Sequence, residues 1–151
     1  MGKRKLLNVF LIALAAIGAL DAGYLTYQHY ASGSVVCGIA AADCDLVLHS
    51  EYSTIFGIPL ALVGFLYYGT VFGLSFAYFR NRKGLYLRSI AGFTGLGFLI
   101  SLILTYIQLF VLEALCTFCL TSALVTTALF AISVYLLKGR TPEKRYEQTY
   151  G

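Results

Sequence analysis

The chain has 151 residues, of which 59% are hydrophobic and only 12% are charged, and its formal net charge is +4. A soluble domain usually carries about 25% charged and about 45–50% apolar residues, so this composition argues against a water-soluble protein and for one embedded in lipid. The length allows a single domain.

Four stretches are apolar enough to cross a bilayer, whose hydrocarbon core needs about 20 helical residues. They cover about residues 6–30, 55–79, 85–112 and 116–137, and their apolar side chains lie all round the helix rather than in one stripe. We therefore predict an all-α integral membrane protein, in which one domain (residues 1–151) forms a bundle of four transmembrane helices. A cleaved signal peptide is the alternative for the first stretch, but its apolar run exceeds the about 7–15 residues of such signals, which favours a retained helix.

The positions of the basic residues predict the orientation of this bundle. The Lys and Arg residues precede the first predicted helix, surround the second connection or follow the fourth helix: positions 3, 4, 5, 80, 82, 83, 88, 138, 140, 144 and 145. Basic connections stay on the cytoplasmic side, so both termini and the tail 138–151 are expected there. The loop 31–54 is then expected to cap the outer end, and the positive net charge requires no nucleic acid as a partner.

All four cysteines fall on the predicted outer side. Cys37 and Cys44 lie in the outer loop, whereas Cys116 and Cys119 begin the fourth helix in the sequence CTFC. An even number of cysteines facing an oxidising compartment favours disulfide chemistry. A zinc site is disfavoured, because the six-residue gap in the loop pair does not match the usual ligand spacing, and no metal is expected.

The CxxC pair has the placement of a redox pair. Residues three apart share a helix face, and the free N–H groups of a helix N-terminus favour a thiolate. The loop pair could accept electrons from a soluble partner and pass them on by thiol–disulfide exchange. The deeper thiol then needs a two-electron acceptor within the bilayer, and a lipid-soluble quinone is the natural candidate. Structural disulfides or packed thiols remain the alternative for both pairs.

Ser50, the segment STIFGIPLALVG at residues 53–64 and CTFC at residues 116–119 follow the outer-loop cysteines along the chain. With this set of features the chain resembles the vitamin K epoxide reductase family, in particular its short prokaryotic members without a fused thioredoxin-like domain. These features occur in this order along the whole chain.

The resemblance implies a role for each cysteine. Cys119 resembles the cysteine that faces the quinone, and Cys116 resembles its exchange partner. Cys44 would form the electron-relaying disulfide with Cys116, and Cys37 would receive reducing equivalents from a thioredoxin-like protein.

The resemblance also implies a quinone-binding set. Ser50 matches a hydroxyl residue that hydrogen-bonds a quinone carbonyl, a contact that could stabilise a developing oxyanion, and Phe56 matches a pocket aromatic. Ser53 and Ala123 stand where the vertebrate enzyme has Asn and Tyr. These two departures weigh against epoxide reduction and against tight binding of anticoagulants.

The implied function is that of a quinone-dependent thiol oxidoreductase in a prokaryotic plasma membrane. It would couple disulfide formation in a separate periplasmic thioredoxin-like protein to the reduction of ubiquinone or menaquinone. Two other classes remain: a membrane scaffold with two structural disulfides, and a small transporter, which the lack of paired intramembrane charges disfavours.

Three titratable residues near the outer side have open roles. Asp21 lies inside the first predicted helix, where a carboxylate is costly against lipid, so it should face the bundle or the interface. It could tune proton supply or make a helix-packing hydrogen bond. His29 and His49 flank the outer loop, and each could relay protons or simply be exposed or hydrogen-bonded.

Overall fold

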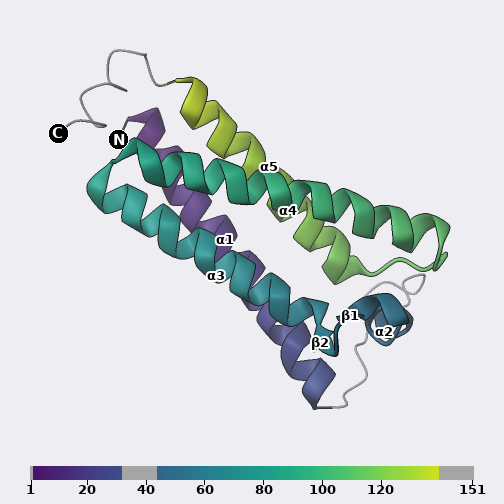
Figure 1. The fold of residues 1–151 in the computed structure, drawn as a ribbon. Helices are drawn as coiled ribbons and strands as arrows, with labels where there is room; N and C mark the ends of the chain where they lie inside the picture. Colours follow the sequence, from purple (N-terminus) through teal and green to yellow (C-terminus); the bar gives the residue numbers. More distant parts are fainter. Residues whose placement is uncertain (1, 32–43, 140–151) are drawn as a thin grey trace.

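The computed structural model describes residues 2–31 and 44–139, and in these residues four long helices form a bundle (Figure 1). The long helices are α1 (Lys3–Tyr30), α3 (Leu60–Asn81), α4 (Gly84–Phe110) and α5 (Thr117–Lys138). Each has at least 22 residues. At about 1.5 Å per residue, each is long enough to cross a hydrocarbon core of about 30 Å. The prediction of an all-α membrane bundle is confirmed.

A small cap of short elements lies between α1 and α3, at the end of the bundle where α5 begins (Figure 1). It consists of α2 (Cys44–Leu48), the 3-10 helix η1 (Glu51–Ser53) and the strands β1 (Thr54–Ile55) and β2 (Ile58–Pro59). The strands pair antiparallel, with Ile55 opposite Ile58. Phe56 and Gly57 form the turn with φ values of 52° and 80°, which suits the glycine but is unusual for a phenylalanine.

This hairpin corrects one predicted helix boundary. The second transmembrane helix was expected from residue 55, but α3 begins at Leu60 because residues 54–59 pair as strands and Pro59 is the N-cap. A proline has no N–H to donate, so it is compatible with this position. The other ends of the long helices differ from the expected ones by at most three residues. Most of the expected outer loop (32–43) and of the expected tail (140–151) lies outside the described residues.

The side chains on the outer surface of the bundle are those of a protein surrounded by lipid. The core is made by side chains such as Leu11, Leu87 and Leu129, which are fully buried. Large apolar side chains on all four long helices are also exposed, for example Leu20, Leu66, Leu96 and Leu124. In water this surface would be unfavourable, whereas in a bilayer it contacts acyl chains while each helix satisfies its own backbone.

Two glycines bring helices close together around the centre of the bundle. A Cβ atom at Gly18 of α1 would lie 2.5 Å from the ring of Tyr68, and one at Gly97 of α4 would overlap the hydroxyl of Tyr67. Small residues allow this kind of close approach in membrane bundles. The two tyrosines of α3 are therefore held between α1 on one side and α4 on the other.

The two ends of the bundle differ in charge and in chemistry. At one end α1 begins, α5 ends and α3 connects to α4 (Figure 1). Every Lys and Arg in the described residues belongs to these helix ends: Lys3, Arg4, Lys5, Arg80, Arg82, Lys83, Arg88 and Lys138. Cys44, Cys116 and Cys119 lie at the opposite end, where α2 and the start of α5 are found.

Candidate functional site

The CTFC sequence begins α5, and its first cysteine is the N-cap. The Cys116 backbone is extended (φ −104°, ψ 115°), and its Sγ accepts a hydrogen bond from the Cys119 N–H at 3.4 Å. The Cys116 N–H in turn donates to Oε1 of the buried Gln108 at the end of α4, at 3.2 Å. The spacing of two intervening residues therefore lets the first sulfur occupy the place where a serine or aspartate oxygen usually caps a helix.

This capping position changes the acidity of Cys116. A hydrogen bond from the Cys119 side chain, helped by the backbone N–H groups of Phe118 and Cys119, lowers the pKa of the Cys116 thiol to about 7. Burial of the side chain and the nearby Asp21 act in the opposite direction. Because the thiolate is the reactive form in exchange, Cys116 is suited to thiol–disulfide chemistry near neutral pH.

Cys44 packs in the same buried cluster as Cys116. Leu25, Val47 and Ala114 complete this cluster, in which Cys44 is 1% exposed and Cys116 is fully buried, and Cys119 packs against its edge. Cys44 is disulfide-bonded, whereas Cys116 and Cys119 are free thiols. The structure thus has a reduced helix pair packed beside an oxidised loop cysteine.

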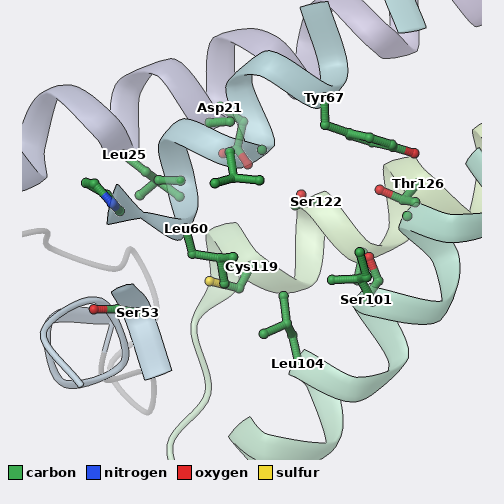
Figure 2. A pocket seen from close by; sticks show the side chains of 18 of the residues that line it. Asp21, Leu25, Ser53, Leu60, Tyr67, Ser101, Leu104, Cys119, Ser122 and Thr126 are labelled. Atoms are coloured by element: carbon green, nitrogen blue, oxygen red, sulfur yellow. The ribbon is translucent and has the colours of Figure 1, made fainter. Parts of the chain in front are cut away.

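Cys119 faces a different environment, a pocket of about 490 Å³ enclosed by α1, α3, α4, α5 and the cap. Its walls are mostly apolar, with side chains such as Leu60, Ile100 and Leu104. Figure 2 shows Asp21 of α1 and Cys119 of α5 facing the same space. The volume lies within the range of about 300–1,000 Å³ that is typical of small-molecule sites.

A polar network lies at the end of this pocket farther from the cap. The Tyr68 hydroxyl hydrogen-bonds the Ser122 carbonyl oxygen (2.9 Å), the Ser122 hydroxyl (2.7 Å) and the Thr126 hydroxyl (2.8 Å). The neighbouring Tyr67 side chain also lines the pocket and points toward Thr126 (Figure 2). The interior of the bundle is therefore polar beside Cys119, although its outer surface is not.

Comparison with known proteins agrees with this geometry. Residues 9–134, well over half of the chain, match the sequence profile described as the Vitamin K epoxide reductase family. The chain belongs to this family. Over 56 residues, or 37% of the chain, it is also 43% identical to thiol-disulfide oxidoreductase LTO1 of Arabidopsis thaliana. This segment covers only 15% of that relative, so the chain spans a small part of the relative's length.

Four of the residues for which the family resemblance implies contact with quinone lie around the pocket: Cys119, Ser50, Ser53 and Ala123. The two hydroxyl groups already have local acceptors. Ser50 donates to the Val47 carbonyl at 2.8 Å, and Ser53 donates to the Ser50 carbonyl at 2.7 Å. Either hydroxyl would have to leave its backbone acceptor in order to donate to a ligand.

The structure does not bring Phe56 into the pocket. Its side chain is fully exposed, and it is absent from the pocket walls. Phe56 lies instead in the two-residue turn at the tip of the hairpin of β1 and β2. The structure therefore does not place Phe56 at the pocket, and its contact with a quinone stays a prediction.

The cysteine pairs are placed only in part. Cys37 lies outside the described residues. The Cys44–Cys116 disulfide that the resemblance implies is not formed in this structure, since Cys116 is a free thiol, but the two residues share one buried cluster.

Sequence reasoning missed the polar side of the pocket. Ser122 and Thr126 follow Cys119 at intervals of three and seven residues, which places them on the same face of α5. That spacing could have identified them. Tyr67, Tyr68 and Gln108 gave no comparable signal, because their positions depend on how α3 and α4 pack against the other helices.

Proposed function

We propose that this protein oxidises the dithiol of a thioredoxin-like partner and transfers the electrons to a membrane quinone. One observation carries the proposal: the two cysteines of the CxxC pair face different environments. Cys116 is buried beside Cys44, and Cys119 lines a pocket among the membrane-spanning helices. Membership of the vitamin K epoxide reductase family and the similarity to a thiol-disulfide oxidoreductase support thiol–disulfide exchange as the general chemistry.

The cysteines form a route for two electrons. A partner dithiol reduces the outer pair of Cys37 and Cys44, and the Cys44 thiolate then attacks Cys116 of an oxidised Cys116–Cys119 pair. Cys119 leaves as a thiolate, and attack of Cys37 on Cys44 releases Cys116. The product has an oxidised outer pair and a reduced helix pair. The cysteine states in the structure, with Cys44 in a disulfide and both helix cysteines free, are those expected just before electrons leave the protein.

The pocket fits a quinone ring as the acceptor. It offers apolar walls for the ring, polar groups beside Cys119 and enough volume, whereas Cys116 is buried in the cluster with Cys44. A bound quinone would supply a two-electron, two-proton acceptor, which matches the oxidation of one dithiol. Ubiquinone and menaquinone are both suitable by this chemistry.

The orientation follows from the distribution of charge. The described basic side chains gather at the helix ends farthest from the cysteines, and such ends stay in the cytoplasm. We therefore propose a prokaryotic plasma-membrane protein with both termini inside and its redox cysteines outside. The partner would be a separate periplasmic protein.

The function can be tested by following quinone absorbance with purified protein, a dithiol reductant and a soluble ubiquinone or menaquinone analogue. Wild type should reduce the analogue and Cys119→Ala should not, because the sulfur at the pocket is lost. Thr121→Ala is the matched control, since Thr121 lies on the same helix, is exposed and only bonds the Thr117 carbonyl. It should retain wild-type activity.

The scaffold alternative makes the opposite prediction. If both cysteine pairs are structural, wild type does not reduce quinone, and mass spectrometry finds both pairs permanently oxidised. That result would overturn the proposed function.

A further inference from the structure

Asp21 is a carboxylate inside the bundle that takes no part in the proposed electron transfer between the cysteines. It lies on α1, lines the pocket and is partly buried. Its Oδ2 is buried and has no hydrogen-bond partner among the described residues, so this oxygen does not make the helix-packing hydrogen bond considered from the sequence. An unpaired carboxylate among membrane helices is costly and usually functional.

No Lys or Arg among the described residues lines the pocket with Asp21. The titratable groups that line the pocket with Asp21 come from α1, α3, the cap and α5: His29, Tyr67, Tyr68, Tyr52 and Cys119. Cys116, at the start of α5, also interacts electrostatically with Asp21, as does Cys119. From α4 the nearest polar groups are uncharged, for example Ser101 and Gln108. Asp21 thus stands close to the reacting sulfurs without a counter-ion.

The same face of α1 connects Asp21 with the cap. Asp21, Leu25 and His29 are spaced by four residues, and all three line the pocket. A helix rises about 1.5 Å per residue, so His29 lies about 12 Å nearer the outer end. There its ring stacks on that of His49, with a centroid distance of 6.2 Å. The pocket therefore has one acid inside and a histidine pair at its outer end.

We propose that Asp21 is a catalytic proton carrier for quinone reduction, taking the thiol proton of Cys119 and delivering it to a quinone oxygen. This inference rests on the proposed function. In the overall step two S–H bonds are lost and one S–S bond forms between Cys116 and Cys119. Two electrons pass to the quinone, and two O–H bonds form on it. Asp21 carries the proton of Cys119 to one quinone oxygen. The second quinone oxygen takes a proton from water that enters past His29, and this proton balances the one that Cys116 releases.

The inference is tested with pre-reduced protein mixed with a soluble quinone analogue in a single turnover. General acid–base catalysis is worth about 10²–10⁴-fold, so Asp21→Asn should slow quinone reduction by at least about 100-fold, and Asp21→Glu should recover part of the rate. Reduction of the outer cysteine pair by a small dithiol should continue at the wild-type rate, because it does not involve Asp21. Leu20→Ala, a lipid-facing neighbour that is 75% exposed, is the control.

Two further readouts separate proton transfer from a structural role. In Asp21→Ala, a small acid such as formate should restore part of the rate of quinone reduction. A purely structural role of Asp21 would not give this rescue. Infrared difference spectra of wild type on reduction should show a carboxyl band that is absent in Asp21→Asn, independently of turnover.

The outcomes distinguish this inference from the function on which it rests. If wild type does not reduce quinone, the proposed function fails. If wild type and Asp21→Asn reduce quinone equally fast, the function stands and Asp21 is not its proton carrier. The inference is also overturned if Asp21→Asn is slow but keeps the carboxyl band, and if formate does not restore the rate of Asp21→Ala.

Discussion

The Cys116 sulfur caps α5, and in the proposed function the same sulfur is a nucleophile. The N–H group that it accepts from belongs to Cys119, so the cap of the helix is also a contact within the redox pair. A thiolate is a better acceptor than a thiol, and the positive end of the helix dipole adds to this preference. Oxidation of the pair would join the two sulfurs in a disulfide that links residues one helical turn apart.

The acidity of Cys116 predicts how quinone reduction depends on pH. With a pKa of about 7, the thiolate fraction falls about tenfold for each pH unit below that value and is nearly complete one unit above it. During quinone reduction the Cys116 thiolate is the form that bonds to the Cys119 sulfur. The single-turnover rate should therefore rise with pH through about 7 and then level off. Rapid mixing of pre-reduced protein with a quinone analogue over a pH series measures this profile.

The profile has a clear contrary result. A rate that keeps rising tenfold per unit through the ordinary thiol pKa of about 8.5 would show that the cap does not stabilise the thiolate. Thr121→Ala, which leaves the cap unchanged, should reproduce the wild-type midpoint.

Individual site residues were predictable only where a local pattern defines them. The CxxC spacing places a sulfur at a helix start whatever the rest of the chain does, and Ser50, Ser53 and Ala123 also lie at the pocket. The sequence does not reveal the acceptors that the serine hydroxyls use, because these are backbone carbonyls three residues earlier in the folded cap. Phe56 was assigned to the pocket by the family resemblance alone, and its exposed position depends on the turn between β1 and β2.

At the scale of helices, the pocket depends on how closely α4 approaches α3. Gly97 leaves room for the Tyr67 ring, which forms part of the pocket wall. A larger residue here cannot be accommodated by the ring without a shift, because the added atom would overlap both its hydroxyl and its nearest ring carbons. The shape of the pocket is thus set by a helix contact and not only by the residues that touch a ligand.

Gly97→Ala should therefore displace Tyr67 and distort the pocket. Overpacking of this kind typically costs about 1–3 kcal/mol, so the midpoint of thermal unfolding in detergent should fall, and the KM for a quinone analogue should rise. Gly92→Ala is the matched control on α4, since a Cβ at Gly92 would meet no atom within 4 Å. It should leave both quantities unchanged or raise stability slightly, and equal effects of the two substitutions would contradict the packing argument.

The helices themselves were the most predictable part of the fold. Each spans about the length that a bilayer requires, and the uniform apolar character of the four stretches is enough to define them. The start of α3 was not predictable in the same way, because residues 54–59 continue the apolar stretch of that helix but pair as a hairpin. Which helices pack together was also beyond the hydropathy pattern, although small residues mark some of the contacts.

At the scale of the whole molecule, the protein is polarised along the helix axes. Among the described residues, basic side chains occupy one end and the cysteines the other, and residues of the cap line the pocket. Sequence alone predicted this polarity, because the positions of charges in short connections determine it. In the proposed orientation, thiol exchange and the basic helix ends face opposite aqueous compartments.

The orientation gives the last prediction. Single cysteines introduced at exposed positions at the two short connections should label differently: Asn81→Cys at the end of α3, and Glu113→Cys between α4 and α5. A membrane-impermeant maleimide added to intact cells should modify Glu113→Cys, because that connection lies at the cysteine end, but not Asn81→Cys until the membrane is opened. Wild type gives the background from the native thiols, of which Cys116 is fully buried. The reverse pattern would place the redox cysteines in the cytoplasm, where disulfides are kept reduced, and would leave the proposed direction of electron flow without an oxidising compartment to serve.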